Sequence, residues 1–158
     1  LAKWLAKMLD QQTATEQYVP KWDRWKTNRQ GVAELERARL DVIFQGVTGP
    51  VYVDVAIVEA GAGSLHARRI RAKKDGEAAV HEEDDKRKRY PGPDLVPFVL
   101  EAGGRLGEAA ETLIRSVAPR DPIERSVAIA SAKRTLSTLL QMGNAEVVIG
   151  AERVRDGL

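Results

Sequence analysis

The sequence predicts an α/β fold with a mixed central sheet of about four strands flanked by helices. Two apolar, β-branched segments, residues 39–45 and 51–58, are separated by the turn residues of 46–50, which predicts a hairpin of central strands. A third apolar segment, residues 95–100, follows a helical pattern, and the last third of the chain has apolar residues at helical spacing. This order favours a mixed sheet with helices on both faces.

The segments before the hairpin are shorter. Residues 1–10 place apolar side chains at helical spacing and predict an amphipathic helix. Residues 15–19 predict a short strand that ends at Pro20. Residues 21–30 are polar apart from Trp22 and Trp25, which favours a loop or a short helical turn.

The segment that follows the hairpin is expected to be an irregular connection over residues 60–75, because it contains two glycines and little apolar periodicity. Residues 77–90 predict a helix that ends before Pro91. This helix carries acid–base pairs four residues apart, among them Asp85 and Arg89, and such pairs stabilise an isolated helix.

The C-terminal third predicts two helices. The first covers residues 106–117, and the second begins at Asp121-Pro122. Gly143 and Asn144 are expected to interrupt the second helix, after which residues 146–154 either continue it or form an edge strand.

The length of 158 residues fits one domain, with an N-terminal helix at 1–12, an α/β core at 13–104 and C-terminal helices at 105–158. No apolar run approaches the roughly 20 residues that cross a bilayer, so membrane insertion is not expected. The chain lacks a secretory signal pattern and an initiator Met, and we expect an intracellular fragment of a longer polyprotein.

Cysteine is absent, which excludes disulfides, zinc fingers and thiol nucleophiles within this chain. With only two histidines, a bound metal would be held by oxygen ligands, which points to magnesium, manganese or calcium.

Basic residues are concentrated between residues 66 and 89, although the net charge is only +2. Such a segment could neutralise nucleic-acid phosphates, or it could be a solvated loop and helix face. The residues expected to contact nucleic acid are Arg68, Arg69, Arg71, Lys73, Lys74, Arg87 and Arg89.

Two carboxylates, Asp41 and Asp54, interrupt otherwise apolar strands. Buried carboxylates are costly unless they are paired, hydrogen-bonded or bound to metal. Counting back from the turn brings these two roughly level across the hairpin, so they could share one divalent cation that activates water for phosphodiester cleavage. The alternative is that each forms a salt bridge to a helix arginine or lies at a strand end.

The spacing of Asp41 and Asp54 resembles the metal-binding signature of the restriction-like (PD-(D/E)xK type) endonuclease domain of non-LTR retrotransposon reverse-transcriptase proteins. In most of that superfamily a lysine lies two positions after the second acid, but this chain has Ala56 there. The retrotransposon branch typically carries the lysine on the following helix, and Lys86 to Tyr90 resembles that motif. Residues 15–20, 95–104 and 136–144 add to the resemblance.

This resemblance implies a restriction-endonuclease-like fold and a set of site residues. Asp41 and Asp54 would be ligands of Mg²⁺ (or Mn²⁺), with Glu16 as an accessory ligand. Lys86 or Lys88 would position the water or stabilise the phosphate, and Tyr90 would contact the phosphate.

The family function would be nicking of DNA, which supplies a 3′ hydroxyl for target-primed reverse transcription of the element RNA. The implied partners are DNA, the reverse transcriptase and that RNA, in the nucleus. Two alternatives remain. The chain could be a catalytically silent, domesticated copy that binds partner protein subunits in a larger assembly, or a nuclease of another type, such as a repair or Holliday-junction enzyme.

Overall fold

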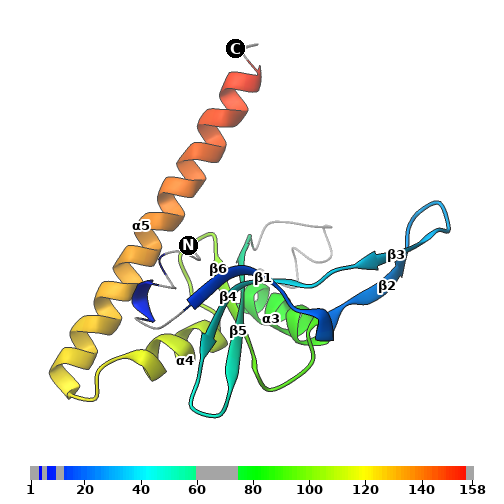
Figure 1. Cartoon of the computed structure of the whole chain (residues 1–158). Coiled ribbons are helices and arrows are strands. Elements are labelled where there is room, and N and C mark those ends of the chain that lie inside the picture. Colours follow the sequence, from blue (N-terminus) through cyan, green and yellow to red (C-terminus); the bar gives the residue numbers. More distant parts are fainter. Residues whose placement is uncertain (1–3, 5–6, 10–12, 60–74, 156–158) are drawn as a thin grey trace.

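The computed structural model describes residues 4, 7–9, 13–59 and 75–155, and shows a mixed α/β arrangement (Figure 1). A four-stranded sheet has the order β1-β4-β5-β6. Its strands are β1 (Thr13–Tyr18), β4 (Arg39–Gln45), β5 (Pro50–Val58) and β6 (Leu95–Glu101). The first three are antiparallel neighbours, whereas β5 and β6 are parallel.

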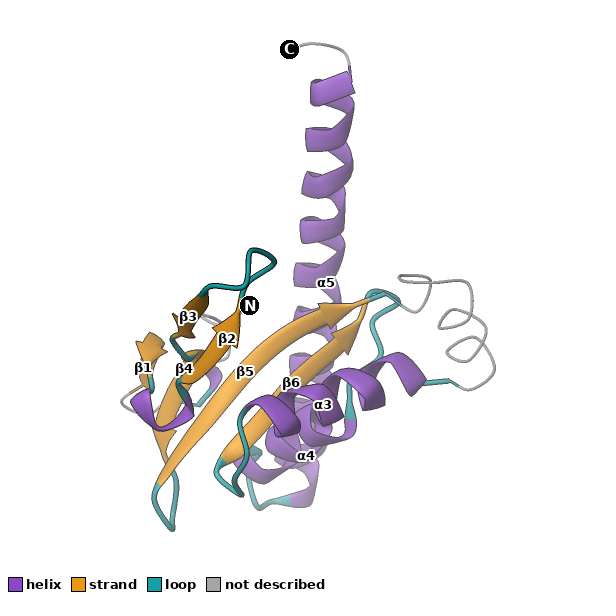
Figure 2. Ribbon diagram, turned by 90° about the vertical axis from the view of Figure 1, so that its right-hand side faces the viewer, coloured by secondary structure: helices purple, strands orange, loops and turns teal. Residues whose placement is uncertain are grey.

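Three helices accompany this sheet in the described part of the chain: α3 (Glu77–Arg89), α4 (Glu108–Val117) and α5 (Pro122–Arg155). Helix α3 connects the parallel strands β5 and β6, as a crossover connection between parallel strands requires. Figure 2 shows α3 and α4 beside β6, and α5 extending well beyond the sheet. No described helix is both long and apolar enough to cross a bilayer.

The two faces of the sheet bury different residues because side chains alternate along each strand. Val42, Phe44 and Val53 belong to the larger core, together with residues of α4 and α5. Tyr52 faces the other way, toward a smaller core that contains Trp22 and Tyr90. Asp41 and Asp54 alternate with the residues of the larger core and therefore lie on the face of this smaller one.

Two carboxylates cap the N-terminal ends of α3 and α4. Glu101 of β6 accepts a hydrogen bond from the backbone N–H of Ala79, in the first turn of α3, at 3.3 Å. Glu83 of α3 accepts one from the N–H of Ala109, in the first turn of α4, at 3.1 Å. Carboxylates at helix N-termini satisfy free N–H groups and complement the helix dipole. These bonds fix α3 against β6 and α4.

The other end of α3 is fixed through the smaller core. The Trp22 indole N–H donates to the carbonyl oxygen of Pro91 at 2.9 Å, just beyond the helix. The Trp22 ring lies 5.4 Å from that of Tyr90 and 5.0 Å from that of Tyr52. The last turn of α3 is therefore held over the sheet face that carries the two acids.

The strands predicted at 39–45, 51–58 and 95–100 are confirmed as β4, β5 and β6, and the helix predicted at 77–90 is confirmed as α3. The strand expected at 15–19 is β1, displaced by one or two residues, and α4 matches the helix expected at 106–117. Residues 4, 7 and 8 are helical, whereas the rest of the helix expected at 1–10 and most of the connection expected at 60–75 lie outside the described residues.

The interpretation of residues 21–30 as a loop or helical turn is wrong for residues 24–27, which form a strand, and holds for the rest of the segment. A short 3₁₀ helix (Pro20–Trp22) is followed by β2 (Arg24–Thr27), which pairs with β3 (Ala33–Glu36) as an antiparallel ribbon. The turn between the strands is stabilised by Asn28, whose side-chain oxygen accepts hydrogen bonds from two backbone N–H groups, and by Gly31 at φ 81°. Figure 1 shows this ribbon projecting from the sheet.

The expected interruption at Gly143-Asn144 is also wrong, because α5 continues through both residues to Arg155. One glycine inside a helix costs only about 1 kcal/mol relative to alanine, too little to break a helix supported on both sides. Of the two alternatives for residues 146–154, the structure therefore has the continuing helix.

Candidate functional site

Asp41 and Asp54 lie where β4 and β5 separate. The two strands pair from Gln45 and Pro50 as far as Val42 and Val53, so the acids occupy the next step, and the prediction that they are level is confirmed. Beyond that point the backbone N–H of Val55 donates to the Asp41 carboxylate at 2.6 Å. The Asp41 side chain thus takes the place of a backbone hydrogen bond between the two strands. Both acids lie at the point where β4 and β5 separate, which we call the fork.

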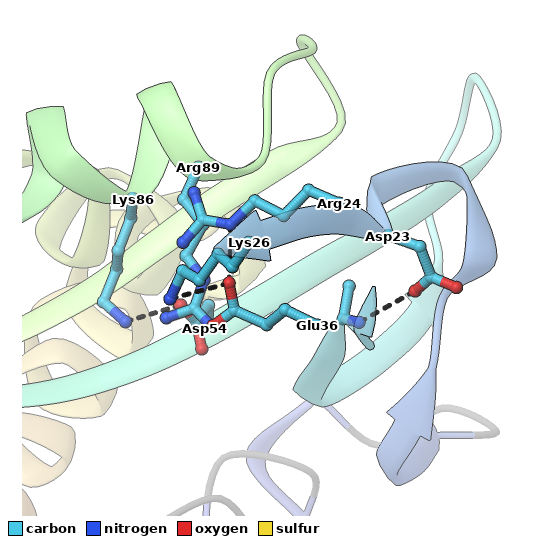
Figure 3. Close-up of polar contacts among 8 residues, drawn as sticks. Asp23, Arg24, Lys26, Glu36, Asp54, Lys86 and Arg89 are labelled. Carbon is cyan, nitrogen blue, oxygen red and sulfur yellow. Dashed lines mark hydrogen bonds and ion pairs between the residues drawn. The ribbon is translucent and has the colours of Figure 1, made fainter. Parts of the chain in front are cut away.

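Lys86 reaches this fork from α3. Its Nζ lies 2.5 Å from Asp54 Oδ2, and the side chains are only 10% and 13% exposed (Figure 3). Breaking such a nearly buried pair leaves an uncompensated charge, which is strongly unfavourable. Lys86 Nζ also lies 3.9 Å from Glu82 on the same helix.

The pKa of Asp54 is raised above its ordinary value. Burial is the main cause, and the neighbouring Asp41 carboxylate adds to it, while the contact with Lys86 acts in the opposite direction. Raised carboxyl pKa values at polar clusters are typical of functional sites and also of structural ion pairs. A carboxylate in this environment would gain from an additional cation.

Tyr90, the residue after α3, is 3% exposed and belongs to the smaller core. It follows Lys86 by one helical turn and packs on Trp22. Its pKa is raised, first by burial and then by the charge of Asp54, while Arg89 lowers it and Glu36 raises it. The pKa of Tyr90 thus responds to Asp54 and also to Arg89 and Glu36, two members of a second charged cluster.

That second cluster is centred on Glu36 of β3, and we call it the Glu36 cluster: Glu36, Arg24, Lys26 and Arg89. The Glu36 carboxylate lies 2.6 Å from Arg24 Nε, 2.8 Å from Lys26 Nζ and 2.7 Å from Arg89 Nη2. These contacts lower the pKa of Glu36 to about 2, chiefly through Lys26 and Arg24. Figure 3 shows the three cations gathered around Glu36, with the Asp54–Lys86 pair beside them.

The remaining residues expected in the site are elsewhere. Lys88 is on another side of α3, 75% exposed, with its ammonium 3.2 Å from Asp85. Arg87 contacts Glu83 at 3.0 Å and Asp84 at 3.4 Å. The expected nucleic-acid contacts Arg68, Arg69, Arg71, Lys73 and Lys74 lie outside the described residues.

Glu16 lies at the step of β1 opposite Asp41, between the pairs Thr15–Val42 and Gln17–Leu40, but it does not join the ladder. Its backbone has φ 53°, a left-handed conformation that costs free energy for a residue with a side chain. Its side chain is exposed. Across the described residues, no three His, Asp or Glu side chains are arranged to hold a metal ion, so Glu16 does not form such a group with Asp41 and Asp54.

The donor set at the fork nevertheless fits one kind of metal. Asp41, Asp54 and Lys86 together carry a net charge of −1, counted from one cation and two anions. Mg²⁺ is commonly bound by one or two carboxylates and keeps several waters. Two level carboxylates on adjacent strands can provide those ligands.

The fork lies apart from an apolar hollow of about 900 Å³ under the sheet's larger core. That hollow has Phe44, Val51 and Leu113 among its lining residues and includes neither acid. Small-molecule sites are usually concave and mostly apolar.

Arg24, Lys26 and Glu36 were missed by the sequence reasoning. Alternation of charged and apolar residues over 24–27 and 33–36, with Asn28 and Gly31 between, was the available signal for the ribbon. The partner of Arg89 was also misassigned: Arg89 contacts Glu36, 53 positions away, and not Asp85 within its own helix. Such a long-range contact has no local sequence pattern.

Comparison of the chain with protein-family models, with curated proteins and with solved structures finds no match in any of the three.

Proposed function

We propose that this chain is a metal-dependent DNA endonuclease domain with a restriction-endonuclease-like fold. One observation carries the proposal: Lys86 of α3 lies against Asp54 of β5, beside Asp41 of β4. Two level acids can hold a divalent cation, and a lysine beside them can stabilise the charge that develops on the phosphate during cleavage. Sequence resemblance to the retrotransposon endonucleases supports the same proposal.

Asp41 and Asp54 would hold Mg²⁺ or Mn²⁺, which when bound polarises a phosphate oxygen and makes its water more acidic. The backbone N–H of Val55 holds the Asp41 carboxylate in place. Lys86 supplies a fixed positive charge where negative charge develops on the phosphate during cleavage. Tyr90, packed on Trp22, positions the last turn of α3 and hence Lys86.

In a retrotransposon protein, this activity would nick one DNA strand and leave a 3′ hydroxyl that primes reverse transcription. The partners would then be DNA, the reverse transcriptase and the element RNA, in the nucleus. The basic residues of α3 and the Glu36 cluster provide positive charge for such a substrate.

The second candidate is a catalytically silent copy that binds nucleic acid or partner subunits. It is favoured by the 2.5 Å contact between Lys86 and Asp54, which neutralises one of the two acids. The endonuclease is preferred because the same contact brings the only suitably placed lysine of the Lys86–Lys88 pair to the acids, as a working site needs.

Plasmid nicking in Mg²⁺ or Mn²⁺ tests the proposal. Asp54→Asn, Asp41→Asn and Lys86→Met should each reduce nicking by a factor of about 100 or more, the range for losing one group that stabilises the transition state. Two matched controls come from the same helix: Lys88→Met and Asp85→Asn, whose side chains are 75% and 67% exposed, should nick like the parent.

Equal nicking by Lys86→Met and Lys88→Met would remove Lys86 from the mechanism. Retained nicking by both acid variants would overturn the metal site. Absence of nicking by the folded parent in either metal would favour the silent binding protein.

A further inference from the structure

The Glu36 cluster brings cations from two distant parts of the chain to one carboxylate. Arg24 and Lys26 project from the same face of the ribbon as Glu36, because Arg24 is paired with Glu36 and Lys26 lies two positions along β2. Arg89 arrives from the end of α3. Both carboxylate oxygens are used, Oε2 by Arg24 and Lys26, and Oε1 by Arg89.

The cluster keeps a surplus of positive charge and of donors. Three cations against one carboxylate leave a net charge of +2. Each guanidinium has five N–H donors, and the contacts with Glu36 use one nitrogen of each arginine. The three cations are 41%, 54% and 42% exposed, so a ligand can reach them.

Position distinguishes this cluster from an ordinary surface network. The comparable group at Glu111 pairs with Arg115 at 2.9 Å and Lys133 at 2.7 Å on α4 and α5. The Glu36 cluster instead includes Arg89, from the last turn of α3, which also carries Lys86. Figure 3 shows the cluster beside the Asp54–Lys86 pair, and hence next to the candidate cleavage site, where a nucleic-acid backbone would pass.

We propose that Arg24, Lys26 and Arg89 form a binding subsite for a phosphodiester group adjacent to the one that is cleaved, and that Glu36 is an internal anion which this phosphate displaces. The inference rests on the proposed function, because that function identifies the ligand as a nucleic-acid backbone. Guanidinium groups match the geometry of phosphate oxygens and form charge-assisted hydrogen bonds with them.

The displacement exchanges one anion for another on the same three cations. Because the pKa of Glu36 is about 2, its carboxylate is charged at any ordinary assay pH and competes with the phosphate. Removing that charge should therefore strengthen binding.

Fluorescence anisotropy with a short fluorescein-labelled DNA duplex, in EDTA and low salt, tests the subsite without metal or cleavage. Glu36→Gln should bind roughly tenfold more tightly than the parent, the scale of one charge-assisted contact. Glu34→Gln is the matched control, since Glu34 lies on the same strand and loses the same charge. It should change affinity by less than about twofold, as expected for an exposed charge.

Arg24→Gln and Arg89→Gln should weaken binding, and each should reduce the slope of log affinity against log salt by about one unit. Arg115→Gln, from the Glu111 network, should leave both unchanged. If either arginine variant fails to fold, judged by circular dichroism, Lys26→Gln replaces it, because Lys26 is the most exposed of the three cations.

Binding by Glu36→Gln no tighter than by Glu34→Gln would overturn the proposal, as would parental salt slopes for the arginine variants. The result is separable from the nicking assay. Tighter binding by Glu36→Gln in a chain that never nicks would keep the subsite and remove the endonuclease, whereas nicking with no effect of Glu36 would do the reverse.

Discussion

The two ends of α3 are held by different chemistry. Over the first two turns, Glu101 bonds to the first turn of α3, and Glu83 in the middle of α3 reaches to the first turn of α4. At the C-terminal end, Lys86 and Arg89 contact carboxylates on strands β5 and β3. Glu101 and Glu83 accept hydrogen bonds from helix N-termini and hold the helices in place, whereas Asp54 and Glu36 contact side-chain cations that we propose to bind a ligand. The carboxylates around α3 thus have two roles: one pair holds the helix in place, and the other pair lies beside the proposed ligand sites.

The largest expected effect is at Gly107, where Glu83 of α3 contacts the start of α4. A Cβ at Gly107 would lie 2.2 Å from Glu83 Oε1 and 3.4 Å from the Val99 carbonyl oxygen. Gly107→Ala should therefore lower the free energy of unfolding by about 3 kcal/mol, because overpacking displaces the buried carboxylate. Gly103→Ala is the control, since a Cβ at Gly103 would meet no atom within 4 Å. Urea unfolding of both variants measures the difference.

The next largest effect on stability concerns the pair formed by Lys86, in the last turn of α3, and Asp54. Lys86→Met should cost about 2 kcal/mol in EDTA, because it leaves Asp54 without its cation. Combined with Asp54→Asn, the loss should not add, and a double-mutant cycle should give a coupling energy of about 1–2 kcal/mol. Additive losses would show that the two side chains do not interact. Magnesium should reduce the cost of Lys86→Met alone if Asp41 and Asp54 bind it.

A smaller loss is expected when Glu83 keeps its shape and loses its charge. Glu83→Gln should cost about 1 kcal/mol, since the amide oxygen can still accept from the Ala109 N–H while the interaction with Arg87 and the helix dipole weakens. Thermal unfolding measures this loss. If Glu83→Gln lowers stability and leaves DNA affinity unchanged, Glu83 supports the fold and takes no part in binding.

The smallest effect is the pH dependence of the Glu36 cluster. The pKa of Glu36 is lowered to about 2 from an ordinary 4.5, so the folded protein favours the charged form. The resulting stability is present above pH 4.5 and is lost as the pH falls through 4.5 toward 2. The pairs are partly exposed, which limits the contribution to less than about 1 kcal/mol. The stability difference between the parent and Glu36→Gln should therefore shrink below pH 4.5 in acid unfolding.

The sequence predicted the elements whose pattern is enforced by burial. Strands β4, β5 and β6 have apolar runs bounded by turn residues, and the level positions of Asp41 and Asp54 followed from the length of the turn between their strands. The sequence could not show whether Lys86 or Lys88 lies beside the two acids. Burial of the last turn of α3 under Trp22 decides which lysine faces the acids, and that contact joins residues far apart in the chain.

The ribbon and its cations could not be predicted in the same way. Segments 24–27 and 33–36 bury almost nothing, so hydrophobic periodicity is weak there. The contact between Glu36 and Arg89 depends on how the ribbon and α3 approach each other in space. At Gly143, local preference favoured a helix break, but the cost of one glycine is small beside the continuity of α5.

Helix α5 also determines how the molecule diffuses. Its 34 residues make a rod of about 51 Å at 1.5 Å per residue. A compact chain of this length would have a radius of gyration of about 15 Å. Because much of the rod extends beyond the sheet in both views, the molecule should tumble anisotropically and sediment more slowly than a sphere of equal mass.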